Sequence, residues 1–306
     1  MIDPFLVVFL ALLIDAAVGE PDALWGKVPH PVKLMGSLVK KCDIQLNHGD
    51  HRRLKGAFAL AACCALMILI GLALEWISIY GIVDVAVVAV LLCQKSLVEH
   101  ARIVASGLRL SLEEGRRAVS HIVGRDVSKL DHSGVVRAAV ESVAENFSDG
   151  IVAPVFWYLV LGLPGILVYK LVNTADSMVG YRNSKYSEFG WSFARLDDLA
   201  NWIPARISAV LIKLWGQPYS GWRDIRRDAA GHRSPNAGWP EAAMASVLGI
   251  SLSGPRSYDG SARQYPYIND DGRKAIGVAY LDSAISLVRK ASAGLAGVVL
   301  LLSFVA

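Results

Sequence analysis

The residues from Gly56 to Leu74 form an unbroken uncharged stretch that is rich in alanine, leucine and isoleucine. A helix of this length crosses the roughly 30 Å hydrocarbon core of a bilayer, so the stretch predicts a transmembrane span. A second run, from Trp76 to Gln94, contains one charged residue, Asp84. Lysine and arginine flank this pair of runs but are missing from the link between them. The positive-inside rule therefore predicts a helical hairpin with both ends in the cytoplasm.

Apolar stretches near the two ends of the sequence predict further spans. Residues 4–18 lack the basic start and the small-residue cleavage site of a signal peptide, and residues 291–306 form a short uncharged tail. Residues 151–169 are also uncharged, but Pro154 and the sequence Gly162-Leu163-Pro164-Gly165 interrupt them. They form either a full crossing or a re-entrant segment. The charge rule favours the re-entrant form, which keeps the basic residues of 170–198 in the cytoplasm.

These features predict an all-α, polytopic integral membrane protein with about four to five transmembrane helices, a re-entrant segment and cytoplasmic amphipathic helices. Residues 216–275 are rich in turn-forming residues and predict an irregular cytoplasmic region. No repeat or boundary is evident, so a single membrane-embedded domain over residues 1–306 is expected. The chain is 54% hydrophobic, which excludes intrinsic disorder, and its net charge of +4 is dispersed, which argues against nucleic-acid binding.

The first candidate site is a row of acids, Glu141, Glu145 and Asp149, whose spacing of four places them on one helical face. Such a row is often a solvated stripe. Here it leads directly into the apolar stretch at Ile151, where uncompensated charge is costly. A hard divalent cation would offset that cost, and magnesium held by carboxylates usually also holds phosphates. We favour a magnesium site.

Two further candidate sites follow along the chain. In residues 173–183, Asn173 and Asp176 share a helical face and Arg182 is a planar donor for a carboxylate or phosphate, although a helix end capped at Gly180 explains the pattern equally well. In residues 189–206, the paired aspartates at 197 and 198 either bind a metal, pair with nearby arginines, or complement the dipole of a helix N-terminus.

A fourth candidate lies in residues 233–241. Pro240 and Glu241 mark the start of a helix after a tight turn. Free backbone amides there, with Arg233 nearby, would suit an anion such as phosphate, and an ordinary loop is the alternative. His30 lies between two prolines, where a histidine is more often structural than catalytic. No P-loop, GxGxxG, HExxH or GxSxG motif is present.

Taken together, these segments closely resemble the adenosylcobinamide-phosphate synthase family, membrane proteins of cobalamin biosynthesis. The likeness covers most of the chain in the same order. The segments that carry it are Asp15–Pro21, His30-Pro31-Val32, Glu141–Pro154, Tyr169–Asn183, Gly190–Arg206 and Ser234–Met244.

The resemblance implies a multi-pass protein of the bacterial or archaeal cytoplasmic membrane with its functional face in the cytoplasm. It implies ATP-dependent amide formation between the propionate of adenosylcobyric acid and (R)-1-amino-2-propanol O-phosphate, or free aminopropanol. ATP and Mg²⁺ are the expected cofactors. The expected partners are the corrinoid, the amino alcohol and membrane lipid, with a homo-oligomer or an assembly with other cobalamin-biosynthesis membrane proteins as a further expectation.

The resemblance marks site positions, and their chemistry leads us to assign roles as hypotheses. The expected magnesium ligands are Glu141, Glu145, Asp149, Asp176, Asp197 and Asp198. The residues expected to stabilise the transferring phosphoryl group are Arg182, Asn183, Arg195 and Arg206. The residues expected to bind substrate are His30, Asn173, Asn201, Arg233, Asn236, Trp239 and Glu241. A membrane transporter or sensor, and a magnesium-dependent membrane phosphotransferase, remain the alternatives.

Overall fold

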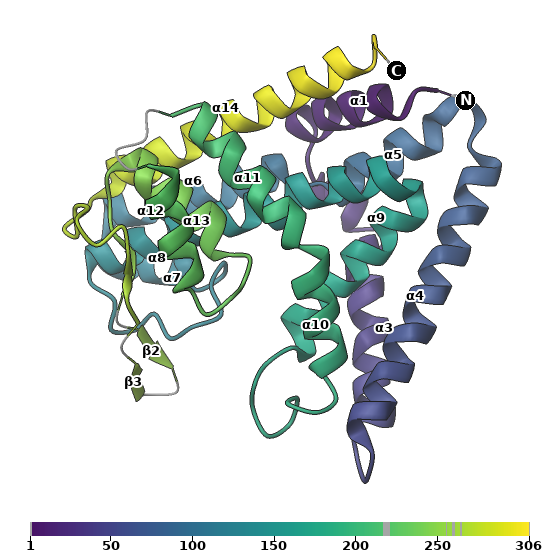
Figure 1. The fold of residues 1–306 in the computed structure, drawn as a ribbon, viewed down its shortest axis with the longest axis horizontal. Coiled ribbons are helices and arrows are strands. Elements are labelled where there is room, and N and C mark those ends of the chain that lie inside the picture. The colour runs from purple at the N-terminus through teal and green to yellow at the C-terminus, as the bar shows by residue number, and fades with distance from the viewer. Residues whose placement is uncertain (1, 217–220, 255, 259–260, 264, 306) are drawn as a thin grey trace. The chain divides into compact units, whose positions relative to one another are not determined.

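The computed structural model describes residues 2–216, 221–254, 256–258, 261–263 and 265–305, and these are predominantly helical (Figure 1). The predicted all-α class is confirmed. Four helical stretches among the described residues are long and apolar enough to cross a membrane. They are Arg52–Ile77, Ile79–Leu110, His132–Val179 and Val278–Leu302. The N-terminal apolar helix, Pro4–Ala17, is shorter.

The packing divides the chain into two compact units, where the sequence predicts one domain. The first unit contains Met1–Cys93, Ala153–Asn201 and Ala296–Ala306, and the second contains Gln94–Val152 and Trp202–Leu295. Each is described here by itself.

The first unit is built around one long helix, α9 (Ala153–Val179), which packs against five others. Those neighbours are α1 (Pro4–Ala17), α3 (Pro31–Leu46), α4 (Arg52–Ile77), α5 (Ile82–Leu91) and α10 (Trp191–Ala200). Two short elements, α2 (Asp22–Trp25) and the 3₁₀ turn η1 (Ile79–Gly81), lie in the connections. The helices α4 and α9 run side by side (Figure 1).

The helix α9 is broken in the middle, as its sequence predicts. Gly162 has a φ of 64°, a left-handed conformation that glycine adopts without a steric penalty, and Pro164 lies inside the helix. The carboxylate of Glu75 in α4 accepts a hydrogen bond of 2.9 Å from the backbone N–H of Leu163, which the break removes from the helical ladder. The choice between a full crossing and a re-entrant segment stays a prediction.

The second unit is built around α8 (His132–Phe147), whose side chains from Val135 to Ala144 are almost all buried. Asp131 caps this helix by accepting a hydrogen bond of 2.7 Å from the N–H of Gly134. A π-helical turn, η2 (Ser148–Val152), follows. The other helices of the unit are α6 (Gln94–Leu110), α7 (Leu112–Val119), α11 (Trp202–Leu214), α12 (Trp222–Ala230), α13 (Gly238–Leu248) and most of α14 (Val278–Leu302).

Residues 216–275 contain more regular structure than the irregular region that the sequence predicts. Both α12 and α13 lie there, and α13 is almost entirely buried against its neighbours. Two small antiparallel pairs are also present, formed by β1 (Leu252–Ser253) with β4 (Tyr267–Ile268) and by β2 (Arg256–Tyr258) with β3 (Ser261–Arg263). Among the described residues, glycines lie at both ends of α12 (Gly221 and Gly231) and of α13 (Gly238 and Gly249). Tertiary packing stabilises these two helices, which local composition does not predict.

Candidate functional site

Two aspartates in the first unit form the centre of the candidate site. Asp176 lies near the end of α9 and Asp197 lies on α10, and these two helices pack together. Burial, followed by the negative charge of Asp176, raises the pKa of Asp197 to about 7. Hydrogen bonds from Asn173 and Asn201 act in the opposite direction. The structure therefore brings together two carboxylates and two amides that the sequence places in separate motifs.

The side chain of Asn201 is held in place by a buried aromatic residue. Asn201 is 1% exposed, and its Oδ1 accepts a hydrogen bond of 2.9 Å from the hydroxyl of Tyr169. This leaves its amide N–H groups to donate toward Asp197. Nδ2 of Asn173 donates a hydrogen bond of 3.3 Å to Oδ1 of Asp197. The indole N–H of Trp157 donates to the carbonyl of Ala200 at 3.0 Å, which fixes the end of α10.

The end of α9 is shaped by a close approach at Gly180. A Cβ at this position would lie 2.0 Å from Oδ1 of Asp176, so only glycine fits without moving the carboxylate. The N–H of Gly180 donates to the carbonyl of Asp176 at 2.8 Å. The helix end at Gly180, one of two interpretations from the sequence, is thus confirmed, and the same turn positions the Asp176 side chain.

Two arginines, Arg182 and Arg195, lie near the third aspartate, Asp198. Nη1 of Arg195 lies 3.6 Å from its Oδ2. Burial raises the pKa of Asp198, and the charges of Arg195 and Arg182 oppose that shift, so both arginines lie near this carboxylate. Asn183 has a local role instead: its Oδ1 accepts hydrogen bonds from the N–H groups of Lys185 and Tyr186, at 3.1 and 3.0 Å.

His30 caps a helix. Its Nδ1 accepts a hydrogen bond of 3.2 Å from the N–H of Val32 at the start of α3, and its ring packs edge-on against Trp25, with centroids 4.5 Å apart. Burial lowers the pKa of His30, which favours the neutral ring that this cap requires. The structural interpretation of this histidine is supported.

In the second unit, Glu141 forms a buried ion pair. Its Oε2 lies 2.9 Å from Nη2 of Arg125, and the two side chains are 7% and 8% exposed. Its Oε1 accepts a hydrogen bond of 2.6 Å from the N–H of Ser253. The charge that the sequence assigns to a bound metal is therefore balanced by an arginine sixteen residues upstream, and both oxygens are engaged.

The other two acids of that row have different surroundings. Glu145 is exposed, and Asp149 is partly buried in the π-helical turn η2. Across the described residues, no group of three or more histidine, cysteine, aspartate or glutamate side chains is arranged to hold a metal ion.

Arg206 is fixed between two tryptophans of the second unit. Its guanidinium lies 4.4 Å from the ring centroid of Trp202 and 4.7 Å from that of Trp239. It donates to the carbonyl of Trp202 at 2.6 Å and to Oδ1 of Asn236 at 3.3 Å. Burial lowers the pKa of Arg206. Asn236 and Trp239, predicted as substrate-binding residues, thus hold this arginine in one orientation.

Glu241 contacts a histidine that the sequence did not single out. Nε2 of His232 lies 3.7 Å from Oε1 of Glu241, and both side chains are nearly inaccessible. Nδ1 of His232 lies 3.2 Å from the backbone nitrogen and 3.3 Å from the carbonyl oxygen of Ser234. The signal available in the sequence was its position immediately before Arg233.

Arg233 lies at the wall of a cavity of about 210 Å³ within the second unit. His232 lines the same cavity, together with the rings of Tyr265 and Tyr267. Arg227 also lines it and is paired with Asp224 and Asp228. The lining is mainly apolar, and its polar part combines these basic groups with the carboxylate of Asp228. Because Asp228 is paired with Arg227, Arg233 is the group that could receive a small anion.

Comparison with known proteins identifies the family. Residues 8–288 match the family described as CobD/Cbib protein. The chain belongs to this family. It is 47% identical to the cobalamin biosynthesis protein CobD of Sinorhizobium fredii, over 96% of this chain and 95% of that protein. The proteins of the same name from Rhizobium meliloti and Rhodobacter capsulatus are 46% and 44% identical, over 92% and 94% of this chain and 91% and 93% of theirs. No solved structure matches.

Proposed function

We propose that this protein is a membrane-embedded enzyme of cobalamin biosynthesis that joins the propionate of adenosylcobyric acid to (R)-1-amino-2-propanol O-phosphate, or to free aminopropanol, through an amide bond. The pathway is supported by membership of the CobD/Cbib family and by the relatives, which are named cobalamin biosynthesis proteins. The substrates and the amide-forming reaction come from the resemblance of the sequence motifs.

Amide formation from a carboxylate requires activation. In the proposed reaction, the propionate oxygen attacks the γ-phosphorus of ATP, which gives an acyl phosphate and ADP. The amine nitrogen then attacks the acyl carbon, and the C–N bond forms as inorganic phosphate leaves and the amine loses a proton. When bound, magnesium would neutralise the negative charge of the nucleotide phosphates.

The observation that carries this proposal is the pairing of Asp176 with Asp197. Burial first, and then the negative charge of Asp176, raises the pKa of Asp197. A divalent cation bound between the two carboxylates would offset both effects. Magnesium is commonly held by one or two carboxylates together with substrate phosphates. We assign Asp176 and Asp197 as its ligands, with Asn173 and Asn201 orienting Asp197.

Arg182 and Arg195 are the proposed donors to the transferring phosphoryl group. Both lie near Asp198, on the same unit as the acidic pair. Arg195 forms an ion pair with Asp198, and both arginines are exposed to solvent. A planar guanidinium donates two parallel hydrogen bonds to phosphate oxygens.

We assign the cavity at Arg233 to the amino alcohol phosphate. Pockets for drug-sized ligands measure about 300–1,000 Å³. At about 210 Å³ this cavity is too small for a corrin ring and suits a small phosphate ester. The transporter alternative depends on Asp84, the charged residue of the run 76–94. Its carboxylate accepts hydrogen bonds from Ser78 and from Tyr158, which gives it a structural role.

The test is reconstitution of the reaction. The full chain is purified in detergent and incubated with adenosylcobyric acid, ATP, magnesium and either aminopropanol phosphate or aminopropanol, and the corrinoid is analysed by mass spectrometry. We expect a mass gain equal to the amide, absent when ATP or the amine is omitted. No product, while another family member is active in parallel, would contradict the proposal. Phosphorylation of an added lipid alcohol instead would support the phosphotransferase.

A further inference from the structure

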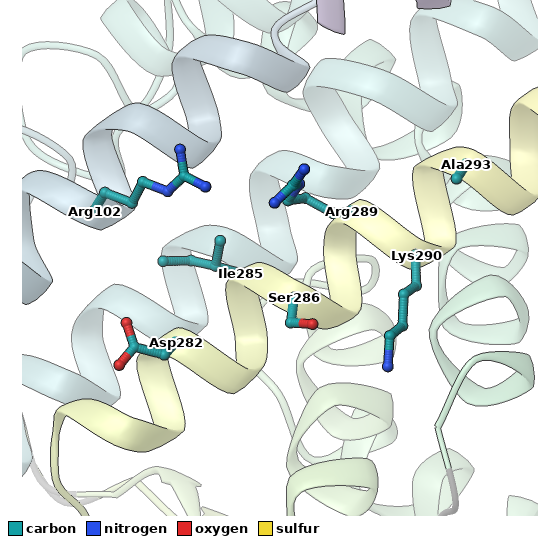
Figure 2. A pocket seen from close by; sticks show the side chains of 7 residues that line it. All are labelled: Arg102, Asp282, Ile285, Ser286, Arg289, Lys290 and Ala293. Carbon is teal, nitrogen blue, oxygen red and sulfur yellow. The ribbon is translucent and has the colours of Figure 1, made fainter.

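A second, larger cavity lies in the second unit, between α6 and α14 (Figure 2). It has a volume of about 460 Å³, and none of its lining residues belongs to the candidate site described above. Its polar walls come from Arg102 on α6 and from Asp282, Ser286, Arg289 and Lys290 on α14. The α14 residues recur at helical spacing, so one face of that helix lines the cavity.

Most of the charged side chains that line this cavity are positive. Figure 2 shows the guanidinium groups of Arg102 and Arg289 pointing toward one another from the two helices. Within the described part of the chain, neither these two arginines nor Lys290 has an ion-pair partner. The acid of the cavity, Asp282, already forms an ion pair with Arg109. Arg102 and Arg289 repel one another, so an anion bound between their guanidinium groups would be stabilised. The side chain of Lys290 points away from these two groups (Figure 2).

The position of Arg289 and Lys290 along α14 indicates the source of the anion. The residues that follow Lys290, from Ala291 to Leu302, include no charged side chain, and α14 is a candidate membrane span. Arg289 and Lys290 therefore stand at the polar end of an apolar helical segment, the level at which lipid phosphates lie. Arg102 lines the same cavity from α6. Ile285 and Ala293 line the same cavity and provide apolar contact area for the adjoining part of a lipid.

We propose that this cavity binds the phosphate of an anionic phospholipid head group. The guanidinium groups of Arg102 and Arg289 bind the phosphate oxygens with paired hydrogen bonds. A soluble compound such as a nucleotide carries the same phosphate chemistry, and the experiment separates these two sources. The proposal goes beyond the ligase function and does not depend on it.

The experiment measures lipid binding to the full chain in detergent by native mass spectrometry. The probes are phosphatidylglycerol, phosphatidylcholine, ATP and inorganic phosphate. We expect one phosphatidylglycerol to bind about tenfold more tightly than phosphatidylcholine. The double substitution Arg102→Gln with Arg289→Gln should remove that preference. The control, Arg223→Gln with Arg226→Gln, makes the same change in charge on exposed residues of α12 and should retain it.

A second variant guards against misfolding. Ser286→Glu places a carboxylate on an exposed wall position and should also abolish the preference without removing an arginine. Equal binding of the two lipids by the wild type, or an equal loss in the control, would overturn the site. Binding of ATP or phosphate that requires Arg102 and Arg289, without preference for phosphatidylglycerol, would support the phosphate site and overturn a lipid as its occupant.

Discussion

Glu141 in the second unit and Asp197 in the first are both carboxylates on helices, and the sequence gives them the same role as metal ligands. The charge of the group beside each carboxylate differs in sign. Glu141 is buried against Arg125 at 2.9 Å, whereas Asp197 lies near a second carboxylate, Asp176. The first arrangement stabilises the ionised form and the second destabilises it. A buried acid is therefore a structural feature in one unit and a candidate cation site in the other.

The largest expected effect concerns the ion pair. Arg125→Leu deprives buried Glu141 of its cationic partner and should lower the free energy of unfolding by about 3–5 kcal/mol. Chemical denaturation in detergent, followed by circular dichroism, measures this. The double variant Arg125→Leu with Glu141→Leu should regain most of the loss. A loss below about 1 kcal/mol in the single variant would show that the two carboxylates do not differ as described.

The next effect concerns catalysis by the first unit. Asp176→Asn keeps the size of the side chain but removes a charge from the proposed magnesium site, and the rate of amide formation should fall about a hundredfold. Glu99→Gln on α6 makes the same chemical change at an exposed position and should retain the wild-type rate. Equal rates for Asp176→Asn and the wild type would remove this acid from the reaction.

A pH-dependent effect sharpens the comparison. Folding raises the pKa of Asp197 from 3.8 to about 7. Between these two pH values the folded chain keeps a proton on Asp197 that the unfolded chain has lost. In magnesium-free buffer, stability should therefore fall as the pH rises from about 4 to about 7. Asp197→Asn should flatten this dependence and be more stable than the wild type at pH 8. Thermal melting at several pH values tests this, and parallel curves for both proteins would refute it.

The smallest effect concerns the hydrogen bond that holds Asn201. Tyr169→Phe removes the hydroxyl that donates to Oδ1 at 2.9 Å and should cost about 1 kcal/mol of stability. Because Asn201 in turn orients Asp197, the apparent affinity for magnesium in the assay should also weaken, by about tenfold. A loss of stability with unchanged magnesium dependence would show that Tyr169 stabilises the fold but does not affect the magnesium site.

The sequence predicted the helical class, the long apolar helices and the break at Gly162, because each depends on local pattern: run length, charge and backbone freedom. It also singled out Asn173, Asp176, Asp197 and Asn201, but from different motifs. Their meeting depends on the packing of α10 against α9, which no spacing rule predicts.

The arginine that pairs with Glu141 shows why the sequence did not predict the charge pairs of the second unit. Arg125 lies sixteen residues upstream of Glu141, in the break that precedes α8, so a search for local compensating charge did not reach it. His232 was missed for a similar reason, because its contact with Glu241 needs the chain to fold back before α13. Charges that meet through tertiary structure are not visible in helical spacing.

The central claim is that the carboxylate pair of the first unit holds a divalent cation. Binding of Mn²⁺, as a paramagnetic substitute for magnesium, to the full chain with ATP tests this directly by electron paramagnetic resonance. We predict one tight site in the wild type, in Glu99→Gln and in Glu145→Gln, and about a tenfold or greater loss of affinity in Asp176→Asn. Unchanged binding in Asp176→Asn, with loss in Glu145→Gln, would contradict the account and favour a metal site in the second unit.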